Sequence, residues 1–141
     1  MLIHLSATNP KPMYEQVVEE IQRLIVSGEM AVGEMLPSIR ELSKELKTSG
    51  ITIRRAYQEL ERSGFIFTRA GKGSFVASLE QDLLREWKME QVQSPLWDSI
   101  AQAKKLGMTA NDLHQMIDQL WEKVDQGKGT TDNQGGPNDE S

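Results

Sequence analysis

The sequence predicts a mainly α-helical fold with one small β-hairpin, in which a larger first part is followed by a shorter helical part. Three observations lead to this prediction. Apolar residues recur at helical spacing in three runs between 13 and 62, aromatic and β-branched runs flank the glycines at 70–73, and amphipathic spacing returns between 79 and 126. A chain of 141 residues has room for one ordinary domain, or for one small domain and an appendage, but not for a large second domain beside the first.

The first helix is predicted to begin at Pro12, because proline suits the first helical position, where the backbone N–H has no intrahelical partner. Val17, Ile21 and Leu24 belong to its apolar face, and Gly28 is expected to end it. Residues 2–5, Leu-Ile-His-Leu, are interpreted as a short leading strand.

A capping box predicts the start of the second helix, because Ser38 is followed three residues later by Glu41. Residues 47–50 are expected to form a short turn before the third helix. The core face of that helix is predicted to hold Ile53, Ala56, Tyr57 and Leu60. A helical wheel then points Arg55, Gln58 and Arg62 away from the core, with Thr52 and Arg54 beside them.

Residues 65–68 and 74–77 are predicted to pair as a β-hairpin with glycines at its turn. Arg69 and Lys72 place positive charge beside that turn. The order helix, helix, turn, helix, hairpin is typical of a winged helix-turn-helix, whose second helix of the pair enters the major groove of duplex DNA.

The charge distribution is compatible with a nucleic-acid partner although the net charge is −5. Residues 40–72 carry eight basic and four acidic side chains, whereas residues 79–141 carry six basic and twelve acidic ones. A local binding surface for phosphate can therefore exist within an acidic chain.

Three sequence blocks together resemble the GntR family of bacterial regulators. The run 36–43, Leu-Pro-Ser-Ile-Arg-Glu-Leu-Ser, is similar to the Leu-Pro-Ser-x-Arg-x-Leu-Ala signature of that family. Residues 52–66 resemble its recognition helix and the exit from it, and residues 69–76 resemble its wing. The resemblance covers about half of the chain and implies a winged helix-turn-helix DNA-binding domain over residues 1–78.

The resemblance also implies a role for each matching residue. Arg40 is expected to bind phosphate and a base, Arg54 to read the major groove, and Gly71 to let the wing approach the minor groove. The full set of expected DNA-binding residues is Arg40, Ser49, Thr52, Arg54, Arg55, Arg69, Gly71 and Lys72. The helical wheel favours Arg55 over Arg54 as the base reader, whereas the resemblance favours Arg54. Gly50 stands where the family commonly has a base-reading arginine, so the preferred half-site sequence is in question.

Residues 79–126 are predicted to form a short two-helix dimerisation segment, similar to that of the YtrA subfamily. Pro95 is expected to kink the first of these helices or to restart it with Ser94 as the cap, and residues 109–112 resemble the start of the next helix. The expected dimer interface residues are Leu83, Trp87, Trp97, Ile100, Leu113, Ile117, Leu120 and Trp121. Two alternatives remain, namely that these helices fold back on the first domain, or that tryptophans and methionines line a small hydrophobic effector pocket at the dimer interface.

These features predict a homodimeric transcription regulator, a repressor, that binds a two-fold-related duplex DNA operator. The subfamily resemblance suggests control of its own operon and of a membrane transporter. The alternatives are a regulator that responds to a small effector, which stays unidentified, and an adaptor that has lost DNA binding, for which Gly50 is the only support.

Other classes of function find no support in the sequence. There is no candidate triad, P-loop or metal cluster, so no catalytic residue, metal or cofactor is predicted. The absence of cysteine is compatible with the reducing cytoplasm, where we expect the protein to lie. No segment approaches the roughly 18 apolar residues of a membrane span, and the N-terminus lacks the pattern of a signal peptide. Residues 127–141 contain no large apolar residue and are expected to be a disordered tail.

Overall fold

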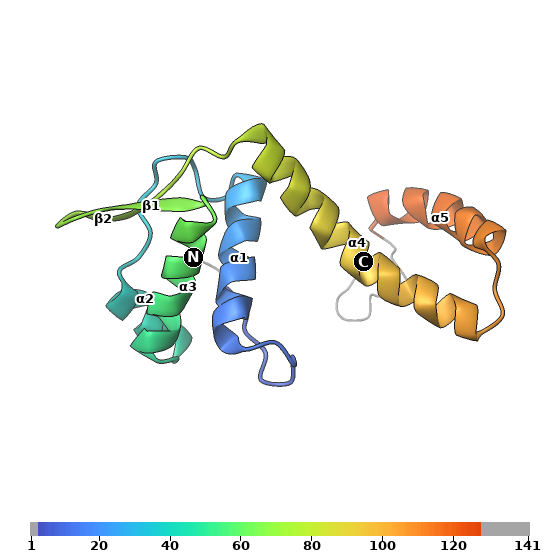
Figure 1. The fold of residues 1–141 in the computed structure, drawn as a ribbon, viewed down its shortest axis with the longest axis horizontal. Coiled ribbons are helices and arrows are strands. Elements are labelled where there is room, and N and C mark those ends of the chain that lie inside the picture. Colours follow the sequence, from blue (N-terminus) through green and yellow to red (C-terminus); the bar gives the residue numbers. More distant parts are fainter. Residues whose placement is uncertain (1–2, 128–141) are drawn as a thin grey trace. The chain divides into compact units, whose positions relative to one another are not determined.

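The computed structural model describes residues 3–127, which divide into unit 1, up to Trp87, and unit 2, from Lys88 onward. The elements are α1 (Met13–Ser27), α2 (Ile39–Leu46), α3 (Gly50–Arg62), β1 (Ile66–Arg69), β2 (Gly73–Val76), α4 (Gln81–Lys105) and α5 (Ala110–Asp125) (Figure 1). The predicted class, mainly helical with one hairpin, is confirmed. The predicted tail lies outside the described residues except for Gly127.

The core of unit 1 forms around α3, which packs against both α1 and α2 (Figure 1). The four residues predicted for the core face of α3 are all buried: Ile53, Ala56, Tyr57 and Leu60. Val17 and Ile21 of α1 and Leu42 of α2 are also fully buried against this face. The spacing of apolar residues in the sequence therefore identified the packed faces of α1 and α3.

Two local signals set the ends of the first two helices. Gly28 ends α1 in the left-handed conformation with φ 86°, as expected. The helix begins at Met13, one residue later than predicted, so Pro12 is the residue that precedes it. The capping box of α2 is present, because the Ser38 hydroxyl accepts from the Glu41 N–H at 3.0 Å and the Glu41 carboxylate accepts from the Ser38 N–H at 2.9 Å.

The predicted leading strand is wrong for Ile3–Leu5, which have no regular structure, while Leu2 lies outside the described residues. The only sheet among the described residues is the two-stranded hairpin, so this segment has no strand partner. Instead, the buried side chain of Gln16 accepts from the Ser6 N–H at 2.8 Å and donates to the carbonyls of Ser6 and Lys11, each at 3.0 Å. The side chain of Ile3 still reaches the core of unit 1.

Helix α4 runs without interruption through Pro95, so the predicted restart at Ser94 is wrong. Proline has no N–H to donate to the carbonyl of Gln91, but Gln91 is exposed, and water can hydrogen-bond to that carbonyl instead. Helix α5 begins where predicted, with a second capping box between Thr109 and Asp112. No helix within residues 3–127 combines the length and the apolar character needed to cross a membrane.

Unit 2 buries very little. Ala103 is its one buried hydrophobic residue among those described, and both α4 and α5 carry large exposed apolar side chains. Trp97 and Trp121, for example, are 71% and 69% exposed. The first turns of α4, up to Trp87, belong to unit 1 and are partly buried. Leu83 and Trp87 pack against the core of unit 1, and the Trp87 indole N–H donates to Gln22 Oε1 at 3.0 Å.

Candidate nucleic-acid interface

Helices α2 and α3 and the turn between them form a helix-turn-helix whose turn is locked by local hydrogen bonds. The Thr48 N–H donates to the Ser43 carbonyl at 3.1 Å, and the Ser43 hydroxyl donates to the Thr48 carbonyl. Lys47 takes the left-handed conformation, with φ 54°, that ends α2. Gly50 is already helical, and a Cβ built there would find its nearest neighbour, Ile39 Cγ2, at 4.0 Å. The turn therefore does not require glycine at position 50.

The first turn of α3 is closed by Ser49 and Thr52, the two hydroxyl residues among the expected DNA-binding residues. Ser49 Oγ accepts from the Thr52 N–H at 3.1 Å and caps the helix, and it lies 2.8 Å from Thr52 Oγ1. Both hydroxyls therefore have intramolecular partners, and a contact from either to a phosphate would be additional to this capping geometry.

The two adjacent arginines of α3 have different surroundings. The guanidinium carbon of Arg55 lies 3.8 Å from the ring centroid of Tyr14, which holds the side chain toward α1 in a cation–π contact. Arg54 is also exposed, but it makes no hydrogen bond or ion pair with another described side chain. The helical wheel treated Arg55 as pointing into open solvent, and no local spacing signal links it to a tyrosine 41 positions earlier in the chain.

The hairpin places the three predicted wing residues at its tip, which extends beyond the helices of unit 1 (Figure 1). Strands β1 and β2 pair antiparallel with Arg69 opposite Gly73, and the Lys72 N–H donates to the Arg69 carbonyl at 2.9 Å. Gly71 has φ 76° and no atom within 4 Å of a Cβ built on it, so another backbone could approach it closely. The Arg69 guanidinium lies 5.2 Å from the ring centroid of Phe67.

The hairpin is also tied to the end of α3. Thr68 Oγ1 donates to Glu61 Oε1 at 3.2 Å, and it lies 3.0 Å from Ser74 Oγ on the neighbouring strand. Phe67 and Phe75 stack across the strands with ring centroids 5.6 Å apart. These contacts fix the wing relative to the helix that would enter the groove.

Most positive charge in this region remains available to a partner. Of the eight basic side chains between 40 and 72, only Arg62 forms an ion pair with a described residue, namely Glu59 in the same helix. The hydrogen bond from Arg62 lowers the pKa of the Glu59 carboxyl. Arg40, in the first turn of α2, is exposed and unpaired among the described side chains.

A buried tyrosine connects α3 to the segment before α2. The Tyr57 hydroxyl donates to the Pro37 carbonyl at 2.7 Å, across twenty positions of sequence. Burial, together with the charges of Glu41 and Glu45, raises the pKa of this phenol, so it stays a neutral donor. The start of α2, which carries Arg40, is thereby held at a fixed place beside α3.

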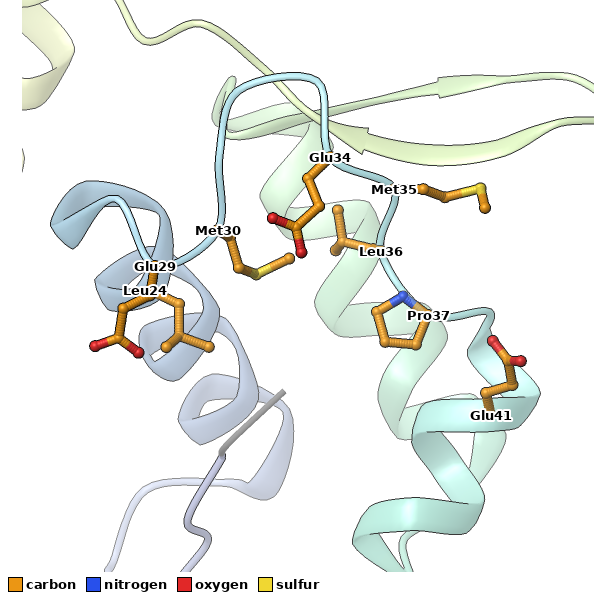
Figure 2. A pocket seen from close by; sticks show the side chains of 8 residues that line it. All are labelled: Leu24, Glu29, Met30, Glu34, Met35, Leu36, Pro37 and Glu41. Atoms are coloured by element: carbon orange, nitrogen blue, oxygen red, sulfur yellow. The ribbon is translucent and has the colours of Figure 1, made fainter.

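An acidic pocket of about 450 Å³ lies between the end of α1 and the start of α2 (Figure 2). Figure 2 shows Met30, Glu34 and Leu36 on the connecting segment, with Glu29 and Glu41 on either side. The carboxylates of Glu34 and Glu41 already accept backbone N–H groups of neighbouring turns. Like charges repel, so this pocket is not a place for DNA phosphate.

Unit 2 holds the rest of the predicted interface residues on α4 and α5. Trp97, Ile100, Ile117 and Trp121 are exposed, while Leu113 and Leu120 are partly buried. Between the two helices lies a mainly apolar pocket of about 240 Å³. Its lining consists of Leu96, Ile100, Ala103, Lys104, Met108, Thr109, Ala110, Leu113, His114 and Ile117, so it includes a methionine but none of the three tryptophans.

The sequence is similar to known DNA-binding regulators. The model of bacterial regulatory proteins of the gntR family matches residues 13–76. The HTH-type transcriptional repressor YtrA of Bacillus subtilis is 32% identical over 127 residues, which span 90% of this chain and 98% of that protein.

Two solved structures are also similar. A GntR family transcriptional regulator from Listeria monocytogenes has a TM-score of 0.67 and 29% identity, over 79% of this chain and 96% of that one. YtrA from Sulfolobus acidocaldarius, a GntR-family transcription factor, has a TM-score of 0.55 and 32% identity, over 67% and 100% respectively. These relatives are transcription regulators and not enzymes. Because the similarity spans both the helix-turn-helix and the helices behind it, this chain belongs to the GntR family of DNA-binding transcription regulators and is YtrA-like.

Proposed function

We propose that this protein is a homodimeric repressor that binds a two-fold-related operator, with α3 in the major groove and the hairpin at the minor groove. The observation that carries the proposal is the exposed basic surface formed by α2, α3 and the wing, because none of its cations except Arg62 has an acidic partner among the described residues. Unpaired cations on a rigid frame can neutralise phosphates without first breaking an internal ion pair. The YtrA-like character extends the proposal to control of its own operon and of a membrane transporter.

Within this proposal, Arg54 reads a base edge, and Arg40, Ser49, Thr52, Arg69 and Lys72 contact the sugar-phosphate backbone. Arg55 adds positive charge beside these residues but does not read a base, because its guanidinium is already stacked on Tyr14. Gly71 lets the tip of the wing approach the minor groove. The resemblance and the surroundings of the two arginines both favour Arg54 over Arg55 as the base reader.

The first test is selection of bound duplexes from a random pool with the full-length protein, followed by gel shifts with the selected sequence and with DNA from upstream of its own gene. We expect enrichment of a sequence with two related half-sites, and lower transcription of a reporter placed behind it. A pool that shows no enrichment contradicts the proposal, and a reporter that is activated contradicts the repressor part of it.

Single variants then separate the roles. Arg54→Ala should cost roughly 1–3 kcal/mol on the operator and flatten the preference at one position of each half-site. Lys72→Ala should weaken binding to operator and random DNA alike, and should reduce the slope of log affinity against log salt by about one unit per subunit. Arg55→Ala is the matched control. If it flattens base preference and Arg54→Ala does not, the assignment of the two residues is reversed.

The apolar pocket in unit 2 favours a second candidate, a regulator that responds to a small apolar effector. Ala103 lies in this pocket and is buried, so Ala103→Leu should fill part of it. An apolar fluorescent probe such as anilinonaphthalene sulfonate should bind the unaltered protein and shift its operator affinity, and both effects should be lost in the variant. Equal probe binding by both proteins would remove this candidate.

A further inference from the structure

Ile51, in the first turn of α3, is the most exposed large hydrophobic residue among those described, at 80%. So exposed a side chain contributes almost nothing to the core of unit 1. A β-branched residue is also a poorer helix former than alanine or leucine. Neither the fold nor the helix explains an isoleucine at this position.

The neighbours of Ile51 leave its side chain prominent. Gly50 precedes it and has no side chain, and the hydroxyls of Ser49 and Thr52 are hydrogen-bonded to each other. The first turn of α3 therefore presents a branched aliphatic group at position 51, beside Gly50, which stands where the family commonly has an arginine.

The outward stripe of α3 also contains Ile51. Residues 51, 54 and 58 follow the i, i+3, i+7 spacing of one helix face, and all three are exposed. Arg55 lies at i+4, but its side chain is held toward α1 by Tyr14. If α3 enters the major groove with this stripe, Ile51 lies on the same side as the base-reading Arg54.

The chemistry of the major groove offers one base feature to an aliphatic side chain. Purine edges and cytosine present hydrogen-bond donors and acceptors, which isoleucine cannot satisfy, whereas thymine presents its C5-methyl group. We propose that Ile51 is a specificity-determining residue that packs against the methyl group of one thymine in each operator half-site. This inference rests on the proposed function, because it requires α3 to read DNA.

The test uses the full-length protein and the operator selected from the random pool. Each thymine of a half-site is replaced in turn by deoxyuridine, which removes only the methyl group. At one position, affinity should fall roughly four-fold per half-site for the unaltered protein, the loss expected for one buried methyl group. Cytosine at that position should bind more weakly than 5-methylcytosine, because the latter restores the methyl group.

The variants show whether Ile51 makes this contact. Ile51→Ala should bind the thymine and deoxyuridine operators equally, while Ile51→Val should keep most of the discrimination. Val32→Ala, an exposed aliphatic residue outside α2 and α3, is the matched control and should discriminate like the unaltered protein. The melting temperatures of all three variants should stay within about 2 °C of the parent, because both residues are exposed.

Three results would overturn the inference while leaving the proposed function in place. These are deoxyuridine tolerated by the unaltered protein at every position, discrimination retained in Ile51→Ala with its affinities unchanged, or discrimination retained in Ile51→Ala while both affinities fall by the same factor, which would indicate a backbone contact. Failure to select any operator would instead contradict the proposed function itself.

Discussion

Unit 1 and unit 2 both contain many apolar residues, but unit 1 buries many of its own whereas unit 2 leaves most of its own exposed. Of the described residues, 16 of the 17 buried hydrophobic ones lie in unit 1, whereas 10 of the 13 large exposed ones lie in unit 2. Unit 1 closes a core around α3 with three helices and a hairpin. Unit 2 contains only α5 and the part of α4 that follows Trp87. Two helices alone cannot cover all of each other's apolar side chains.

The difference shows where each unit obtains its stability. Unit 1 can be stable by itself because its apolar surface is already removed from water. Unit 2 leaves many large apolar side chains exposed on both helices, and in globular proteins a large exposed apolar patch marks a site of association. A second copy of the chain is the partner we propose, since an identical surface is self-complementary in a two-fold dimer.

The largest expected effect comes from placing charge on the exposed face of unit 2. The double variant Ile117→Asp with Trp121→Asp should be monomeric in sedimentation and should bind the operator at least about 100-fold more weakly, because the linkage between two half-sites is lost. Val32→Asp, an exposed change in unit 1, should remain dimeric. A double variant that still sediments as a dimer would place the interface elsewhere.

Truncating one buried and one exposed apolar residue sharpens the contrast between the units. Leu60 is fully buried, so Leu60→Ala should lower the free energy of unfolding by about 2–5 kcal/mol at every protein concentration. Ile117 is 45% exposed in the single chain and would be buried only by the proposed dimer, so Ile117→Ala should instead lower the melting temperature by an amount that depends on concentration. Melting curves over a hundred-fold range of concentration distinguish the two, and an Ile117→Ala effect independent of concentration would contradict the comparison.

Tyr57→Phe tests a polar contact inside the core of unit 1. The variant keeps the ring but removes the hydrogen bond to the Pro37 carbonyl, so stability should fall by about 1 kcal/mol. Chemical denaturation measures this change. Because the start of α2 is released, operator affinity should fall as well, and unaltered stability would show that the bond contributes nothing net.

The smallest expected effect concerns the surface pair of Glu59 and Arg62. The folded state lowers the pKa of Glu59, so its contribution to stability is present above the ordinary carboxyl pKa and is lost as the pH falls through the lowered value. Arg62 is largely exposed and Glu59 partly exposed, so Glu59→Gln should shift the melting temperature at pH 7 by no more than about 2 °C, and less in high salt. A larger shift would mean that the pair takes part in the packing of the wing.

Much of the fold and of the candidate site followed from short-range patterns in the sequence. The apolar spacing of α3 named its four core residues, and two capping boxes marked the starts of α2 and α5. Gly71 and Gly73 predicted the hairpin turn, where both take positive φ. These signals are reliable because the interactions behind them join residues only a few positions apart, and the backbone geometry of one turn determines them.

The tertiary structure alone decided what depends on distant neighbours. Arg55 stacks on Tyr14 of α1, the Ser6 N–H donates a hydrogen bond to Gln16, and the Trp87 indole donates one to Gln22. The two residues of each pair are ten or more positions apart in the sequence. The uninterrupted course of α4 through Pro95 belongs to the same group, because no local rule gives the outcome of one lost hydrogen bond inside a long helix. The sequence thus determined which helices form and to which family the chain belongs. Only packing decided which arginine of α3 stacks on Tyr14, because side-chain direction depends on contacts between elements that spacing along one helix does not contain.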